Sequence, residues 1–141
     1  MKQLFILFSI CVFAFTLSFC SEGKKEEKHE PQKVSELAQL MRTMYDDGEQ
    51  MKAAVEKGEL PPDFREKFKK MHTAIPTEPL SNKPAFDAFA NQYLAIIDSV
   101  YSAPNAEIRK KNYNAMVTQC VSCHEVYCPG PIKRIKKLTL N

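Results

Sequence analysis

Hydrophobic residues in the first half of the chain follow the period of an α-helix. Between residues 34 and 55 they recur at alternating spacings of three and four, and charged and amide side chains fill the other faces. This stripe consists of Val34, Leu37, Met41, Met44, Gly48, Met51 and Val55. Pro31 can open the helix, and Gly58 can cap its end before the proline pair 61–62 prevents continuation. The pattern therefore predicts a long amphipathic helix.

Three more segments carry helical patterns, separated by proline-marked loops. Asp63 and Glu66, at the spacing of a capping box, mark the start of a short second helix. Its inward-facing residues are Phe64, Phe68 and Met71. Those of a third helix, which starts near Pro84, are Phe86, Phe89, Ala90, Tyr93, Ile96, Ile97 and Val100. A fourth helix has on one side Tyr113, Met116, Val117, Cys120, His124 and, at its end, Tyr127. Four such helices predict an all-α fold, an antiparallel four-helix bundle over residues 33–128.

The N-terminal region has a different pattern, which is typical of a targeting segment. Lys2 is followed by an apolar run from residue 4 to residue 19, then by Cys20 and a charged stretch to residue 32. The end of the run, Leu17-Ser18-Phe19-Cys20, resembles a bacterial lipoprotein signal, although Phe19 stands where those signals usually carry a small residue. The resemblance implies a signal peptide over 1–19, lipidation of Cys20 and a polar tether over 20–32. An uncleaved N-terminal anchor is the alternative.

Composition and charge narrow the class of protein. The chain has 141 residues, enough for one domain. Its four glycines and its long stretches rich in lysine, glutamate, alanine and methionine suit helices better than a turn-rich β architecture. A net charge of +3, without interleaved arginine and aromatic residues, argues against nucleic-acid binding. No nucleophile–base pair or carboxylate dyad is brought together by the sequence, so we do not expect an enzyme.

The segment Cys120-Val121-Ser122-Cys123-His124 carries the clearest chemistry. Cys-x-x-Cys-His is the attachment sequence for c-type haem. Helical residues at i, i+3 and i+4 share a face, so both cysteines and the histidine can address one flat ligand. The thiols add to the two haem vinyl groups, and the imidazole binds the iron. The sequence therefore predicts one covalently bound haem c, and a location outside the cytoplasm agrees with it because haem is attached there.

Other interpretations of these cysteines remain open. Cys128 could complete a zinc site with the three motif residues, although four ligands would be crowded on successive helical turns. A thioredoxin-like redox pair would need to lie at the N-terminus of a helix that follows a strand. A disulfide, or two buried thiols beside an unrelated histidine, is the remaining case. For Cys128 itself we expect a small buried residue at the helix end, and a disulfide between two chains is the alternative.

The position of the motif, in the last helix of a four-helix bundle, resembles class II cytochromes c, the cytochrome c prime family and its low-spin relatives. Met44, Gly48, Met51 and Lys57-Gly58 in the first helix look like that family's first-helix pattern. The resemblance implies that Cys120 and Cys123 hold the haem, that His124 is the proximal ligand and that Met44 lies at the distal position. It also makes a homodimer an expectation, because dimers are common in the family.

The sequence leaves open which residue, if any, is the sixth ligand of the haem iron. A methionine on a helical stripe usually fills the core, and Met41 or His72 can replace Met44 as the ligand. Iron without a sixth ligand, facing an apolar pocket, is a further alternative.

Residues 129–141 continue beyond the point where the family usually ends. The segment 129–131, Pro-Gly-Pro, should stop the last helix. Ile132, Ile135 and Leu138 then recur at threes, with lysine and arginine between them. We expect a short basic appendage that packs its apolar edge on the bundle. Its charges are either solvated surface or a patch that attracts an acidic redox partner or anionic lipid headgroups.

These features together predict a membrane-tethered c-type cytochrome of the periplasm or cell envelope, which passes single electrons between extracytoplasmic redox proteins. The main alternative is a five-coordinate haem protein that binds NO or CO. A zinc- or thiol-based structural module without haem is the third hypothesis.

Overall fold

Residues 34–141 are described by the structure, a computed structural model. Over these residues the chain is 71% helical and contains no strand, so the prediction of an all-helical fold is confirmed. The expected signal peptide (1–19), the tether (20–32) and the lipidation site Cys20 lie outside the described residues. Within residues 34–141, no helix combines the length and the hydrophobicity needed to cross a bilayer.

Helix α2 (Glu36–Glu56) is the long amphipathic helix expected from the first stripe. Its N-cap is Ser35, whose hydroxyl accepts a hydrogen bond from a first-turn amide at 3.2 Å. At the other end Gly58 adopts φ 75°, and the amide of Glu59 donates to the carbonyl of Ala54 at 2.9 Å. This is the glycine-dependent Schellman ending, so the predicted cap at Gly58 is confirmed.

The remaining helices are α3 (Arg65–Phe68), the 3₁₀ helix η1 (Lys69–His72), α4 (Lys83–Tyr101), α5 (Ala106–Tyr127), α6 (Ile132–Ile135) and the 3₁₀ helix η2 (Lys136–Leu138). The capping box expected at Asp63 and Glu66 is wrong. The Asp63 carboxylate accepts from the amide of Arg65 at 3.0 Å and binds the Arg65 guanidinium, while Glu66 pairs with Lys69. The two carboxylates that a capping box would need therefore form short-range ion pairs instead.

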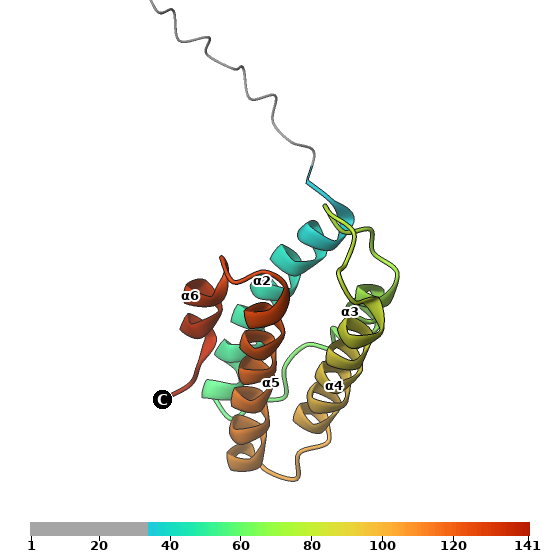
Figure 1. Cartoon of the computed structure of the whole chain (residues 1–141). Coiled ribbons are helices and arrows are strands. Elements are labelled where there is room, and N and C mark those ends of the chain that lie inside the picture. Colours follow the sequence, from blue (N-terminus) through green and yellow to red (C-terminus); the bar gives the residue numbers. More distant parts are fainter. Residues whose placement is uncertain (1–33) are drawn as a thin grey trace, which may run out of the picture. The chain divides into compact units, whose positions relative to one another are not determined.

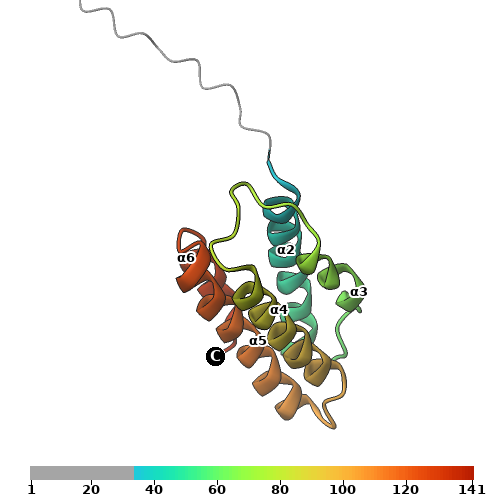
Figure 2. The ribbon, with the colours of Figure 1, turned by 45° about the vertical axis from the view of Figure 1, so that its right-hand side comes forward.

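Helices α4 and α5 form an antiparallel pair with the most extensive contact in the molecule (Figure 1). Helix α2 packs on α5, and the short pair α3–η1 bridges α4 and α2 (Figure 2). Asparagine caps start both long helices, since Asn82 and Asn105 accept from first-turn amides at 3.0 and 2.9 Å. The fully buried centre contains Met51, Phe68, Ile97, Val100, Tyr113 and Met116.

The C-terminal segment 132–140, which we call the strap, lies along α2 and α5 (Figure 1). Ile135, Leu138 and Leu140 are buried in the same core cluster as the long helices, which confirms that the segment packs its apolar edge on them. Asn114 of α5 anchors the end of the strap, because its side chain exchanges two hydrogen bonds with the backbone of Leu140, at 2.9 and 3.0 Å.

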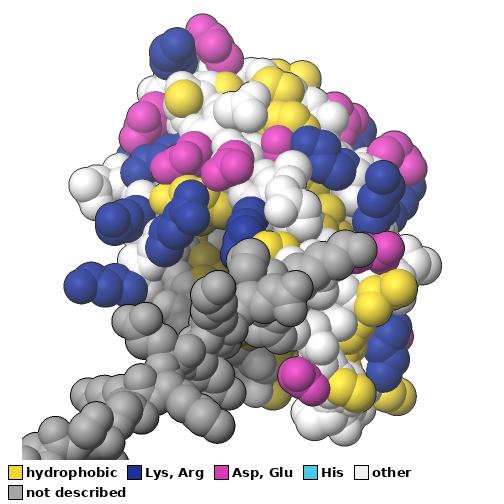
Figure 3. Space-filling view, turned by 90° about the horizontal axis from the view of Figure 1, so that it is seen from above, with side chains coloured by type: hydrophobic (Ala, Val, Ile, Leu, Met, Phe, Trp, Pro, Cys, Tyr) yellow, Lys and Arg dark blue, Asp and Glu magenta, His cyan; other side chains and the backbone are white. Residues whose placement is uncertain are grey.

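The cations of the strap differ in their surroundings. The guanidinium of Arg134 lies 3.9 Å from the centroid of the Tyr45 ring and 3.5 Å from the carboxylate of Asp46. Lys133, Lys136 and Lys137 are exposed. In the part of the surface visible in Figure 3, basic and acidic side chains are interspersed. At least one of the four cations is thus held by the protein itself.

Candidate functional site

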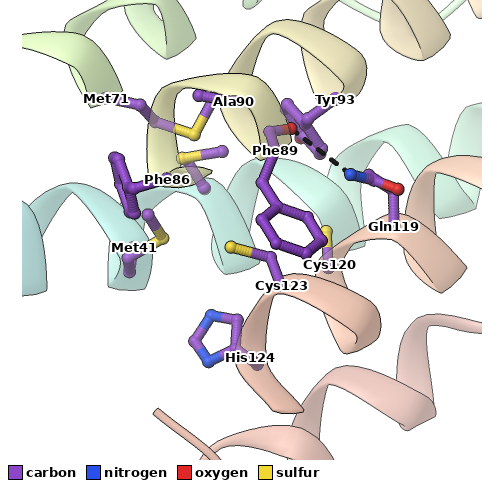
Figure 4. A pocket seen from close by; sticks show the side chains of 11 residues that line it. Met41, Met71, Phe86, Phe89, Ala90, Tyr93, Gln119, Cys120, Cys123 and His124 are labelled. Carbon is purple, nitrogen blue, oxygen red and sulfur yellow. Dashed lines mark hydrogen bonds between the residues drawn. The ribbon is translucent and has the colours of Figure 1, made fainter. Parts of the chain in front are cut away.

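One pocket brings the predicted motif together with three methionines (Figure 4). Helix α5 contributes the motif side chains, α2 contributes two methionines, η1 contributes a third, and α4 closes the far side. The lining residues are Met41, Met44, Met71, Phe86, Phe89, Ala90, Tyr93, Gln119, Cys120, Cys123 and His124. Five of the eleven carry sulfur, and only Gln119, Tyr93 and His124 carry nitrogen or oxygen in their side chains.

The two motif thiols face an apolar environment. Burial raises the pKa of Cys120 to about 12, and it also raises the pKa of Cys123. Both groups are free thiols. A redox-active Cys-x-x-Cys pair needs the opposite shift, toward a stabilised thiolate at a helix N-terminus. Cys120 and Cys123 instead lie in the last two turns of α5, so the surroundings give no support to the thioredoxin-like interpretation.

His124 has a defined hydrogen-bond partner that the sequence did not reveal. Its Nδ1 lies 2.9 Å from the backbone carbonyl of Cys128. A carbonyl oxygen only accepts, so Nδ1 carries the proton and Nε2 keeps its lone pair in the neutral ring. An iron-binding imidazole needs this arrangement, with one nitrogen free and the other held by an acceptor.

Three thioethers, rather than one, line the pocket. Met44 is 9% exposed and Met71 is 5% exposed, and Met41 is partly buried. Met71 was expected only as a core residue of the second helix. Its position in the pocket depends on η1 packing against α4 and α2, which is a long-range contact. The structure therefore brings Met41 and Met44 to the motif as expected, and adds Met71.

His72 does not line the pocket. Its Nδ1 lies 2.9 Å from Asp87 Oδ1, and the same carboxylate binds Lys83. The pKa of Asp87 is lowered, mainly by the hydrogen bond from Lys83 and then by that from His72. His72 is thus part of a half-exposed ion-pair cluster, separate from the motif residues.

An aromatic cluster closes the pocket between α4 and the end of α5. The ring of Tyr127 meets Phe86 and Phe89 edge-on, with centroids 5.5 and 6.2 Å apart. The Tyr127 hydroxyl donates to the carbonyl of Asn82 at 2.8 Å. In Figure 4 the ring of Phe89 extends from α4 toward α5, which carries the two thiols. On the other side, the Gln119 amide donates to the carbonyl of Phe89 at 3.3 Å.

The side chains that line the pocket include the donor groups that a haem needs, but the pocket in this conformation is too small to hold a haem. Two thiols, an imidazole with a free nitrogen, and soft thioethers within an apolar lining are the groups that covalent haem ligation uses. The volume of the pocket is about 40 Å³, while ordinary cofactor pockets measure roughly 300–1,000 Å³. The side chains that close the pocket, above all Phe89, would have to repack around a macrocycle.

The metal and disulfide interpretations gain no support from the described residues. Between residues 34 and 141, no three His, Cys, Asp or Glu side chains lie close enough together to hold a metal ion. Cys120, Cys123 and Cys128 are all free thiols. A zinc site would require the three cysteines and His124 to converge on one point. In the structure these four side chains do not converge.

The expectation of a buried Cys128 is wrong. Helix α5 ends at Tyr127, and Cys128 is its C-cap, with φ −160° and ψ 81°. Its side chain is exposed as a free thiol, because the chain turns at residues 129–131 before it can bury this position.

Comparison with known proteins assigns no family. No known protein family, no curated protein and no solved structure matches the chain.

Proposed function

We propose that this protein is a c-type cytochrome that carries single electrons outside the cytoplasm, with one haem bound through Cys120 and Cys123. The observation that supports this most strongly is the state of His124. The imidazole shares a pocket with both thiols, and its Nδ1 is tied to a backbone carbonyl. The nitrogen that would bind iron is thereby left free.

Each group of residues has a distinct task in this proposal. A bound haem would supply a ferric–ferrous couple, which is the one-electron chemistry of such proteins. Cys120 and Cys123 would become uncharged thioethers, which suits a pocket that already disfavours their thiolates. His124 Nε2 would bind the iron, and a thioether from α2, with Met44 proposed first, would be the second protein ligand. Phe86 and Phe89 would exclude water.

We extend the proposal to the architecture and to the location. The proposed fold is a bundle like that of the class II cytochromes c, in which α2, α4 and α5 would be three of the helices and α3–η1 a shortened second helix. A lipidated Cys20 would tether this domain to a membrane of the cell envelope. Exchange of Cys20 for Ser should release the protein from washed membranes, and continued membrane association would favour an uncleaved anchor.

Mass spectrometry of the full chain, produced in a host that attaches c-type haem, tests the proposal directly. We expect the mass of one haem above that of the processed chain. Cys120→Ala and Cys123→Ala should each remove one covalent bond, and the double variant should carry no covalent haem. Cys128→Ala is the matched control and should retain it. The bare polypeptide mass from a competent host would refute the proposal.

A small-gas binder is the second candidate, and the apolar wall formed by Phe86, Phe89 and Ala90 favours it. If no thioether bound the iron, these side chains would line part of the space open to a gas ligand without offering it a hydrogen bond. Optical spectra separate the two cases. A low-spin ferric form with the methionine–iron charge-transfer band supports electron transfer, whereas a high-spin ferrous form that takes up CO supports gas binding.

A further inference from the structure

His124 and Cys128 are joined by two hydrogen bonds at the end of α5. The Cys128 amide donates to the His124 carbonyl at 3.0 Å, and the His124 Nδ1–H donates to the Cys128 carbonyl at 2.9 Å. The first is an ordinary last bond of a helix. The second exists only because the Cys128 carbonyl does not continue the helical direction.

Pro129 accounts for the conformation of Cys128. The ring of a proline clashes with a preceding residue in the α conformation and forces that residue into the extended region. Cys128 has φ −160° and ψ 81°, which lies outside the α region that the proline excludes. Its carbonyl is thus turned out of the helix, where the imidazole of His124 can reach it.

The strap holds the other side of this turn. Residue 132 donates its amide to the Pro129 carbonyl at 3.1 Å, and two residues of α6 donate to the Pro131 carbonyl at 2.9 and 3.0 Å. Ile135 and Leu138 then bury their side chains against the long helices. Two prolines, each with a fixed φ, connect this anchored segment to Cys128. The Cys128 carbonyl is therefore fixed from both directions.

We propose that Pro129 is a positioning residue, which sets the tautomer and orientation of the His124 imidazole through the carbonyl of Cys128. The inference rests on the proposed function for its redox consequence, but the tautomer itself does not depend on haem. An acceptor on Nδ1 makes the ring a stronger donor to a metal. Pro129 thus favours the ferric state of a bound iron.

Nitrogen-15 NMR of the haem-free full chain, with labelled histidine, tests the tautomer directly. The spectra are recorded about two pH units above the ordinary histidine pKa, and the His124 signals are assigned with the His124→Gln variant. We expect the Nδ1–H form to dominate. In Pro129→Ala the ratio of Nδ1–H to Nε2–H should fall about three- to tenfold, as loss of one hydrogen bond implies. Pro131→Ala is the matched control: it does not directly follow Cys128, so it should lower the ratio by less than Pro129→Ala does.

A second variant tests the role of the strap without changing a proline. Leu138→Ala loosens the strap without touching residues 124–129 and should also lower the ratio, by less. Val100→Ala removes a comparable buried group from α4 and should leave it unchanged. An Nδ1–H form that does not dominate in the wild type, an unchanged ratio in Pro129→Ala, or an equal change in Pro131→Ala would overturn the inference.

The loaded chain gives an independent redox result. Pro129→Ala should shift the ferric–ferrous equilibrium toward the ferrous form by up to about tenfold, which is a rise of about 59 mV in midpoint potential for one electron. An unchanged potential would overturn the redox part of the inference. If the chain cannot be loaded at all, the proposed function fails, while the tautomer ratios still decide the role of Pro129.

Discussion

Gly48 of α2 lies directly against Leu138 of the strap. A Cβ placed on Gly48 would come within 3.1 Å of Leu138 Cδ1. Glycine in a helix interior costs about 1 kcal/mol relative to alanine, and here the close approach of a distant segment gives a reason for it. The sequence pattern placed Gly48 on the hydrophobic stripe, and the structure shows which side chain occupies the space.

Overfilling this contact should destabilise the fold. Gly48→Val is expected to lower the free energy of unfolding by about 1–3 kcal/mol, because the added methyl groups displace Leu138. Urea titration measures the change, and Ala53→Val, at an exposed position of the same helix, is the control. Leu138→Ala in the same chain should relieve part of the cost, with a coupling energy of at least about 0.5 kcal/mol. Strict additivity would contradict the contact.

The ion pair between Asp47 and Lys67 should respond asymmetrically to substitution. The Asp47 side chain is 5% exposed and accepts from Lys67 Nζ at 2.7 and 3.0 Å, whereas the Lys67 side chain is 39% exposed. Lys67→Met strands a buried carboxylate and should cost about 1–3 kcal/mol. Asp47→Asn frees a lysine that can reach water, and should cost less. Lys69→Met, in the exposed pair with Glu66, should change stability by less than about 0.5 kcal/mol.

Thiol reactivity of the haem-free chain should follow the surroundings of each cysteine. Cys128 is exposed, while burial raises the pKa of Cys120 to about 12. The thiolate is the reactive form, so at neutral pH iodoacetamide should modify Cys128 first and Cys120 last. Peptide mass mapping over time gives the order. Rapid modification of Cys120 at neutral pH would instead support a redox-active thiol pair.

The three thioethers can be distinguished by volume-conserving substitution in the loaded chain. Met44→Leu should abolish the methionine–iron charge-transfer band of the ferric form. Met41→Leu and Met71→Leu should retain it and serve as matched controls, since such exchanges usually cost less than about 1.5 kcal/mol. A band that survives Met44→Leu and disappears in Met71→Leu would move the ligand from α2 to η1.

Local patterns predicted the elements of the fold well. The stripe from Leu37 to Val55, the cap at Gly58 and the helix start beside Pro84 depend on neighbours in sequence, and all three appear in the structure. Val34, predicted as the first residue of the stripe, instead lies before α2 and is exposed. Local reasoning failed at Asp63, where Arg65, two residues further on, binds the carboxylate. It also failed at Cys128, whose exposure depends on where the following turn sends the chain.

The details of the pocket were less accessible to sequence reasoning. Met71 enters it through tertiary packing, and no local period distinguishes a pocket methionine from a core methionine. The burial of Asp47 did leave a signal, since it lies three residues after Met44 and four before Met51 on the inward side of α2. Sequence reasoning did not identify the acceptor of His124, although a proline at 129 constrains the residue before it.

The hydrogen bond from Tyr127 to Asn82 joins the last residue of α5 to the residue just before α4. These two helices form a hairpin whose other end is the short connection 102–105. The phenol of Tyr127 therefore ties together the two helix ends that lie opposite this connection. Its loss would remove the hydrogen bond that joins the open ends of the hairpin, beside Phe86 and Phe89 of the pocket.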